Sequence, residues 1–219
     1  MQTRETVIQE ILDKKLIAII RGAQEGQALA AARALLDGGV RLVELTFNQS
    51  KPETFAGTAN AIRNICDCLG DKVTVGAGTV ISVEQVELAA QAGASYIISP
   101  DTDEAVIKKT RELGLVSLPG AFTPTEAKIA HNAGADFVKL FPCLDGPEYL
   151  KAIMAPLSHI RFLAVGGITP ENAKAFLQAG AAGLGVGGSL VNKKLLDAGD
   201  YMQIKENACR FIRSMREDA

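Results

Sequence analysis

Short apolar runs recur along the whole chain and are separated by more polar segments. Eight such runs are present, each four to six residues long, and none alternates cleanly between apolar and polar side chains. This pattern is typical of strands in a parallel sheet that is covered on both faces, because neither face meets water. The predicted strands are Leu16–Ile20, Leu42–Phe47, Val73–Gly76, Tyr96–Ser99, Leu115–Leu118, Phe137–Phe141, Arg161–Val165 and Ala182–Val186.

The segments between the runs have helical patterns, for example at Ala28–Leu36, Pro52–Leu69, Val83–Ala92 and Glu104–Leu113. Capping residues precede several helices, and glycine follows several of them just before the next strand. The expected caps are Ser82, Asp101 with Thr102, Thr123 and Thr169. The glycines are Gly38, Gly39, Gly93, Gly114, Gly134 and Gly180.

Eightfold alternation of strand and helix predicts the α/β class and a closed (β/α)8 TIM barrel. Two helices are additional. Thr3–Asp13 is an extra N-terminal helix that would cover the base of the barrel, and Tyr201–Arg216 would complete the outer ring. Without a linker or a shift in composition, we expect residues 1–219 to form one domain.

Composition narrows the function classes. A formal net charge of −2 gives no reason to expect a nucleic-acid partner, although a local positive site could still bind a phosphorylated small molecule. The most apolar N-terminal run, Leu16–Ile20, is too short for a membrane span or a signal peptide, so we expect a cytoplasmic protein. Four scattered cysteines and two histidines offer few candidates for a metal site.

Lys139 is a charged residue inside the apolar strand Phe137–Phe141. Barrel enzymes carry their chemistry at the C-terminal ends of the strands, and lysine is rarely buried without a reason. A free lysine, with a pKa of about 10.4, is only about 0.1% neutral near pH 7.4. Burial would lower the pKa and produce a nucleophilic amine. A snorkelling stem or a structural ion pair is the alternative.

Glu44 and Arg21 are further charges at strand positions. Glu44 stands within Leu42–Phe47 and suits general acid–base catalysis, or alternatively an ion pair with Lys139. Arg21 follows the first strand and suits a carboxylate ligand, which guanidinium binds with two hydrogen bonds, although a solvated arginine is an equal reading.

Glycine-rich turns end three of the strands. Gly76-Ala77-Gly78-Thr79 would let backbone N–H groups approach a ligand closely. Gly166-Gly167 and Gly187-Gly188-Ser189 follow the seventh and eighth strands, where barrels often hold phosphate. Tight turns into helices would explain the same glycines.

Taken together, these residues resemble the family of 2-keto-3-deoxy-6-phosphogluconate (KDPG) and 4-hydroxy-2-oxoglutarate (KHG) aldolases over nearly the whole chain. Each motif alone is weak, but their order and spacing are specific. The motifs are Val43-Glu44-Leu45-Thr46, Gly76-Ala77-Gly78-Thr79-Val80, Ile98-Ser99-Pro100, Leu118-Pro119-Gly120, Val138-Lys139-Leu140-Phe141-Pro142 and Gly166-Gly167-Ile168-Thr169-Pro170.

The resemblance implies a homotrimeric class I aldolase that needs no metal or other cofactor. Its substrate would be a 2-oxo acid, cleaved reversibly to pyruvate and an aldehyde. Lys139 would form the Schiff base and Glu44 would move protons. The resemblance further implies carboxylate binding by Thr79, with Arg21, and phosphate binding by the glycine turns. The expected phosphate ligands are Gly166, Gly167, Gly188 and Ser189.

Two positions depart from the phosphogluconate pattern. Asn48 stands where many members have arginine, and Val165 stands where many have threonine. Both resemble the 2-keto-3-deoxy-6-phosphogalactonate branch, so that epimer is an alternative substrate. A phosphate-binding lyase or isomerase without an imine, and a non-catalytic sugar-phosphate binder, are the other hypotheses, because the fold alone does not decide among them.

Overall fold

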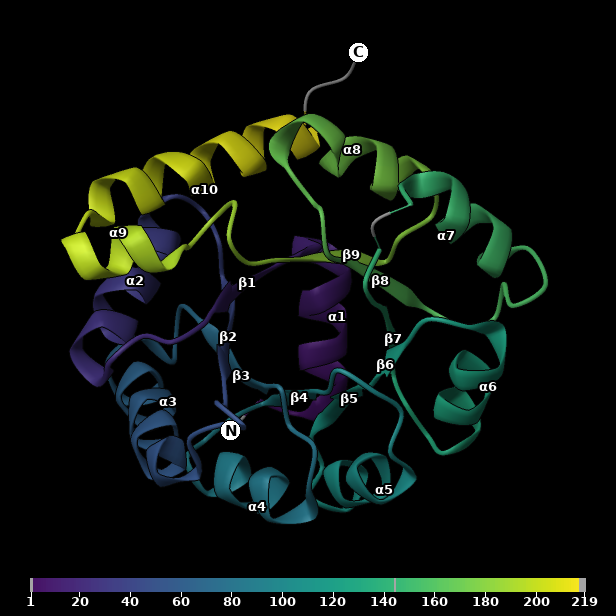
Figure 1. Ribbon diagram of the computed structural model, residues 1–219, viewed down its shortest axis with the longest axis horizontal. Helices are drawn as coiled ribbons and strands as arrows, with labels where there is room; N and C mark the ends of the chain where they lie inside the picture. Colours follow the sequence, from purple (N-terminus) through teal and green to yellow (C-terminus); the bar gives the residue numbers. More distant parts are fainter. Residues whose placement is uncertain (1, 144, 217–219) are drawn as a thin grey trace.

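The computed structural model describes residues 2–143 and 145–216 and shows a nearly closed barrel of parallel strands inside a ring of helices (Figure 1). All the strands belong to one sheet with the order β5-β4-β3-β2-β1-β9-β8-β7-β6. The predicted TIM-barrel fold is confirmed. The strands are β1 Leu16–Ile20, β2 Leu42–Thr46, β3 Thr74–Gly78, β4 Tyr96–Ile98, β5 Val116–Leu118, β6 Gly120–Ala121, β7 Val138–Leu140, β8 Phe162–Val165 and β9 Gly183–Val186.

The fifth predicted strand, Leu115–Leu118, appears as β5, and a short strand that was not predicted, β6, follows it after Pro119, so eight expected strands appear as nine in the described chain. Proline has no N–H to donate to a sheet ladder, which ends regular pairing at this residue. The two strands have different neighbours: β5 pairs with β4 on one side, and β6 pairs with β7 on the other. The Pro119 carbonyl still accepts the Lys139 N–H at 2.8 Å, so hydrogen bonding continues across the division.

The helices surround the sheet, except for α1, which lies across the barrel opening at its base (Figure 1). Predicted caps Ser82, Thr123 and Thr169 begin their helices, and Gly39 and Gly93 adopt positive φ values of 95° and 96° as expected. The helices are α1 Arg4–Lys14, α2 Glu25–Asp37, the 3-10 turn η1 Pro52–Thr54, α3 Phe55–Leu69, α4 Val83–Gln91, α5 Glu104–Glu112, α6 Pro124–Asn132, α7 Pro147–Met154, α8 Pro170–Gln178, α9 Lys193–Ala198 and α10 Tyr201–Arg216.

Two helix starts differ from the prediction. The cap of α5 is Asp103, whose carboxylate accepts the Ala105 N–H at 2.7 Å, so the expected caps Asp101 and Thr102 were wrong. Helix α2 begins at Glu25 rather than Ala28, because the Gln27 side chain folds back onto the Gln24 N–H at 2.9 Å and closes an unusual capping box.

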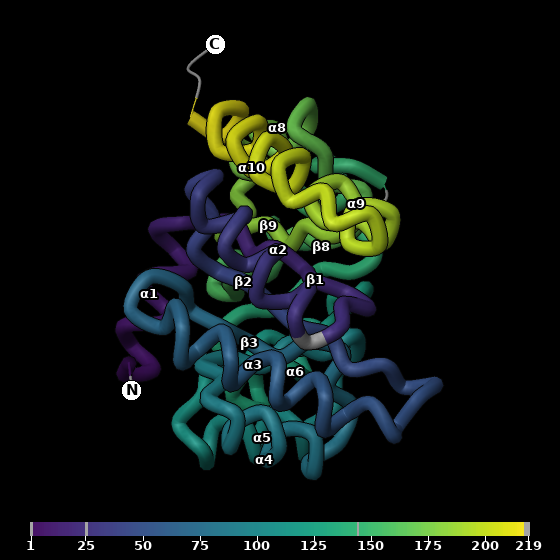
Figure 2. The backbone as a smooth tube through the Cα atoms, turned by 90° about the vertical axis from the view of Figure 1, so that its left-hand side faces the viewer, coloured from purple at the N-terminus to yellow at the C-terminus, as the bar shows by residue number. Residues whose placement is uncertain are grey.

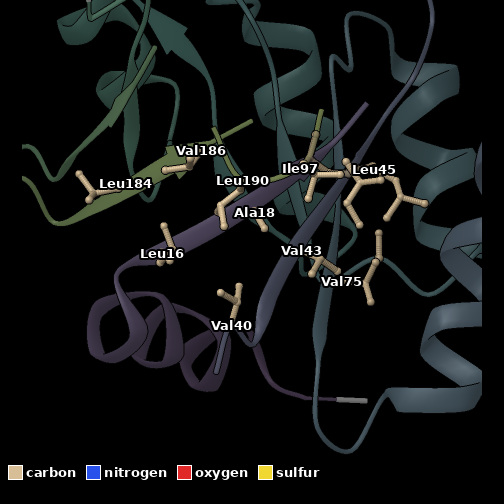
Figure 3. Packing of buried hydrophobic residues seen from close by; sticks show 14 of the residues in the cluster. Leu16, Ala18, Val40, Val43, Leu45, Val75, Ile97, Leu184, Val186 and Leu190 are labelled. Atoms are coloured by element: carbon tan, nitrogen blue, oxygen red, sulfur yellow. The ribbon is translucent and has the colours of Figure 1, made fainter. Parts of the chain in front are cut away.

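Two separate clusters of buried side chains divide the core. The outer cluster fills the space between sheet and helices, and Figure 3 shows part of it around β1. The inner cluster fills the barrel interior and is closed from below by Val7 and Ile11 of α1. Figure 2 shows α1 at one end of the barrel, while the segment between β2 and α3 projects from the other end.

Membership of the two clusters shows which face of the sheet many strand residues occupy. Side chains alternate along a strand, and Leu16, Ala18 and Ile20 of β1 belong to the outer cluster, whereas Ile17 belongs to the inner one. The same alternation places Leu42 of β2 inside the barrel. Phe137, which precedes β7, also faces inward. The residues two positions after each of these inward residues therefore face the interior as well.

Candidate functional site

Lys139 and Glu44 both face the interior of the barrel. Glu44 lies two residues after the inward Leu42, and Lys139 lies two residues after the inward Phe137. Both are buried, with exposed fractions of 7% for Lys139 and 2% for Glu44. An ionisable lysine and an ionisable glutamate thus share one enclosed space above an apolar floor.

Burial favours the uncharged forms of both groups. It lowers the pKa of Lys139 below the ordinary lysine value. The nearby Glu44 opposes this shift, while the Arg21 charge adds to it. Burial also raises the pKa of Glu44, against the opposing influence of Lys139 and Arg21. A lysine with a lowered pKa has a larger neutral fraction at a given pH, and the neutral amine is the nucleophile.

Lys139 and Glu44 are not an ion pair. Within the described residues, neither side chain forms a hydrogen bond, and neither forms an ion pair with an N···O distance of 4.0 Å or less. The nearest aromatic partner of the amine is Phe141, whose ring centroid lies 4.6 Å from Nζ. The two groups therefore make no direct contact of ion-pair length among the described residues, although each charge acts on the pKa of the other.

Glycine and tyrosine on the neighbouring strands fix the place of Glu44. A Cβ atom on Gly78 would lie 1.6 Å from Oε1 of Glu44, so only glycine leaves room for the carboxylate. Gly76 similarly makes room for the ring of Tyr96, and the Tyr96 hydroxyl donates to the Val43 carbonyl at 2.6 Å. The first Gly-X-Gly motif therefore accommodates protein side chains, which its sequence did not indicate.

A cavity of about 620 Å³ opens at the C-terminal ends of the strands. It brings together the predicted Lys139, Arg21 and both glycine turns, while Glu44 and Thr79 do not line it. Phe141, Asn192 and Lys193 also line the cavity and were missed from the sequence. Asn192 and Lys193 were missed because no apolar run in this part of the sequence predicts the short helix α9. The predicted phosphate residues in the lining are Gly166, Gly167, Gly188 and Ser189.

The glycine turns present backbone donors to the cavity. Gly167 has a φ of 69°, and in the described chain the N–H groups of Gly167, Gly188 and Ser189 donate no hydrogen bond to protein. The Ser189 hydroxyl donates to the Ile168 carbonyl at 2.7 Å and ties the two turns together. Unused N–H groups converging from two turns are suited to an anion.

Arg21 and Thr79 lie on the two sides of Glu44, on the neighbouring strand ends. Arg21 lines the cavity and has no ion pair or hydrogen bond in the part of the chain that the structure describes. Asn48 uses its amide oxygen in its own turn, accepting from the Ser50 hydroxyl at 2.8 Å, so Arg21 is the better placed carboxylate ligand. Thr79 adopts a positive φ of 54°, and its hydroxyl has no partner among the described residues.

Neither a candidate metal-binding cluster nor a membrane-spanning helix is found among the described residues. In residues 2–143 and 145–216, no three His, Cys, Asp or Glu side chains are grouped so that they could hold a metal ion. No helix in those ranges is both long and apolar enough to cross a membrane.

Comparisons with known proteins agree on one family. The model described as "Aldolase: KDPG and KHG aldolase" matches residues 7–207. The chain is 39% identical to the 2-dehydro-3-deoxy-6-phosphogalactonate aldolase of Escherichia coli K12, over 92% of this chain and 95% of that protein. It is 35% identical to the KHG/KDPG aldolase of the same organism, over 86% of each chain. A solved structure described as "Native KDPGal structure" has a TM-score of 0.83 and 38% identity, covering 92% of this chain and 94% of the other.

Proposed function

The chain belongs to the KDPG and KHG aldolase family and is a carbon–carbon lyase, and from this premise we propose that Lys139 cleaves a 2-oxo-4-hydroxy acid through a Schiff base. The observation that carries the proposal is an unpaired, buried lysine with a lowered pKa in a cavity lined by anion-binding turns. Pyruvate and an aldehyde are the products.

The reaction follows from the two buried groups. The neutral amine of Lys139 attacks the 2-oxo carbon to give a carbinolamine. Glu44, whose pKa is raised by burial, donates its proton to the hydroxyl that departs as water, which leaves a protonated imine and an ionised Glu44. Glu44 accepts the proton of the C4 hydroxyl, and the electron pair of the breaking C3–C4 bond moves into the imine to form an enamine. The aldehyde leaves, C3 takes a proton, and water releases pyruvate and restores Lys139.

The remaining residues hold the two ends of the substrate. Arg21 and Thr79 bind the carboxylate at the end beside Lys139. The backbone N–H groups of Gly167, Gly188 and Ser189, with Gly166 shaping the turn, bind a phosphate at the other end. Support comes from the cavity, which Arg21 and the glycine turns line together, from the place of Thr79 at the end of β3, and from donors that have no protein partner among the described residues.

Borohydride trapping tests the imine. Pyruvate and borohydride together should add one reduced adduct to the protein, located on Lys139 by peptide mass spectrometry. Lys139→Met is the control, and Lys193 is the critical alternative because it also lines the cavity. An adduct on Lys193, or turnover without any adduct, would favour an imine-free lyase or isomerase. Binding without turnover would favour a sugar-phosphate binder.

The substrate is either KDPG or KHG, or the phosphogalactonate epimer, which differs from KDPG at C4. Asn48 and Val165 follow the galactonate pattern, and the galactonate aldolase relative is 39% identical, compared with 35% for the KHG/KDPG enzyme. These observations favour the galactonate epimer as the second candidate. Pyruvate release from both phosphorylated epimers and from KHG, measured side by side, distinguishes them.

A homotrimer in the cytoplasm remains a prediction of the family resemblance. Light scattering during size-exclusion chromatography tests the trimer, since a monomer of 23.1 kDa is readily separated from an assembly three times larger.

A further inference from the structure

The loop after β3 holds Thr79 in an unfavourable backbone conformation. Its φ of 54° lies in the left-handed region, which β-branched residues rarely enter because their side chain crowds the backbone. Residues persist in such conformations only when surrounding contacts hold them there, and they gather at functional sites. The contacts that hold Thr79 are therefore informative.

Two glutamines hold this loop from opposite sides. The Gln49 side-chain amide donates to the Thr79 carbonyl at 2.5 Å. The Gln85 amide oxygen accepts the Ile81 N–H at 2.8 Å, two residues further along the same loop. The two side chains also bind each other, since Nε2 of Gln85 donates to Oε1 of Gln49 at 2.9 Å. The Val80 N–H between these two contacts donates to the Ile98 carbonyl at 3.2 Å, so the loop is held by β4 at its middle and by the connected glutamine pair at Thr79 and Ile81.

The pair joins the elements that carry the carboxylate end of the site. Gln49 follows β2, the strand of Glu44, and Gln85 lies in the first turn of α4, which follows β3. Thr46 of β2 and Gly78 of β3 are neighbours in the sheet, so the two strand ends are adjacent. Gln85 is only 4% exposed, and a buried amide is costly unless its donors and acceptors are matched, as they are here.

The conformation leaves Thr79 available to a ligand. Neither its N–H nor its hydroxyl has a hydrogen-bond partner in the described chain, although its carbonyl is held by Gln49. The Thr79 N–H belongs to the preceding peptide, whose Gly78 carbonyl accepts the Phe47 N–H at 2.9 Å. The peptides on both sides of Thr79 are therefore held, which sets the direction of the free donors. Donors fixed in this way lose no conformational entropy when a ligand binds.

We propose that the Gln49–Gln85 pair is a positioning device that holds Thr79 in the left-handed conformation required to bind the substrate carboxylate. The inference rests on the proposed function. The glutamines themselves touch no substrate and act through Thr79. Gln49 provides the clearest test because it is half-buried, so its replacement disturbs packing less than replacement of Gln85.

The test measures trapping of Lys139 by borohydride over a range of pyruvate concentrations. For Gln49→Leu, we expect the half-saturating pyruvate concentration to rise about tenfold, while the extent of trapping at saturation stays at the wild-type value. Gln49→Glu, which keeps the length but loses the donor, should behave similarly. Gln203→Leu is the matched control, because Gln203 is a half-buried glutamine that binds Asn207 within α10 and not the loop after β3.

A double-mutant cycle separates positioning from general stability. If Gln49 acts through Thr79, Gln49→Leu should add no further rise in a Thr79→Ala background. A rise of the same size in both backgrounds, or an unchanged half-saturating concentration in Gln49→Leu, would overturn the inference while leaving the aldolase proposal intact. Failure of the wild-type protein to trap pyruvate on Lys139 would overturn both.

Discussion

Asp136 and Lys139 carry buried charged side chains only three positions apart, but they differ in their hydrogen bonding. The Asp136 side chain is 4% exposed and accepts hydrogen bonds from Arg4 of α1, from Arg111 at 2.9 Å and from the Ser117 N–H at 2.9 Å. Lys139 has no such partner among the described residues. One lies just before β7 and the other lies inside it.

The difference distinguishes a structural charge from a chemical one. Several charged and polar donors hold the buried Asp136 carboxylate, which fastens α1 and α5 to the base of the barrel. Burial raises the pKa of this carboxyl, and the Ser117 N–H and Arg4 oppose that shift. A buried amine without partners is poised to react, because desolvation favours its neutral form and a ligand has nothing to displace. In the sequence, both appear only as single charged residues beside apolar ones, so the sequence alone does not separate them.

Replacing Lys139 should have the largest effect on activity. In Lys139→Met, pyruvate release should fall at least about 10³-fold, because the buried amine proposed to form the imine is removed. The free energy of unfolding should stay constant or rise, since an unpaired buried amine is removed. A coupled assay of pyruvate release and urea unfolding measure the two quantities. Retention of a tenth of the activity would disprove the assignment.

Replacing Asp136 should lower the stability of the protein and leave its activity almost unchanged. Asp136→Asn should lower the free energy of unfolding by about 2–3 kcal/mol, because hydrogen bonds to charged groups are lost and two arginines keep their charge. The turnover number should change less than about threefold. Glu171→Gln breaks an exposed ion pair with Arg210 and should leave the free energy of unfolding nearly unchanged. Equal costs for the two variants would contradict the distinction.

A smaller effect is expected where packing positions a charge. Gly78→Ala places a methyl group on the Glu44 carboxylate, so the turnover number should fall about 10- to 100-fold with the protein still folded. Gly57→Ala in α3 meets no atom within 4 Å and should raise the free energy of unfolding by up to about 1 kcal/mol. Steady-state kinetics and thermal unfolding of both variants check this, and full activity of Gly78→Ala would count against a role for Glu44.

The smallest effects concern the pKa of Lys139. Glu44 raises this pKa and Arg21 lowers it. The neutral amine reacts, so reductive methylation of Lys139 by formaldehyde should increase as pH rises through its pKa. The pH midpoint should move down in Glu44→Gln and up in Arg21→Gln. Peptide mass spectrometry across a pH series measures both. Shifts in the same direction would show that the two charges do not act on Lys139 as described.

Local sequence patterns predicted the barrel and most of the mouth, because strands and glycine turns depend on short stretches of residues. The pattern overlooked the division at Pro119, since a proline between two apolar runs reads as the end of a strand. It also placed Lys139 and Glu44 in strands, and alternation from Phe137 and Leu42 then turns both inward.

Contacts between distant segments could not be predicted in this way. Gln49 and Gln85 are 36 residues apart, and Arg4 and Asp136 are 132 apart, so no local periodicity connects them. The same limit explains why Glu44 and Lys139 resembled an ion pair. Their separation within the barrel depends on the sheet register, which a strand pattern does not contain.

The division at Pro119 has a mechanical consequence. β5 and β6 are the two edges of the sheet and follow one another in the chain. The barrel therefore closes where the carbonyls of two successive residues accept hydrogen bonds from segments on opposite sides. Leu118 accepts the Ser99 N–H on one side, and Pro119 accepts the Lys139 N–H on the other. Opening of the barrel at this seam would therefore displace the backbone of Lys139, so the proposed nucleophile is mechanically coupled to closure of the sheet.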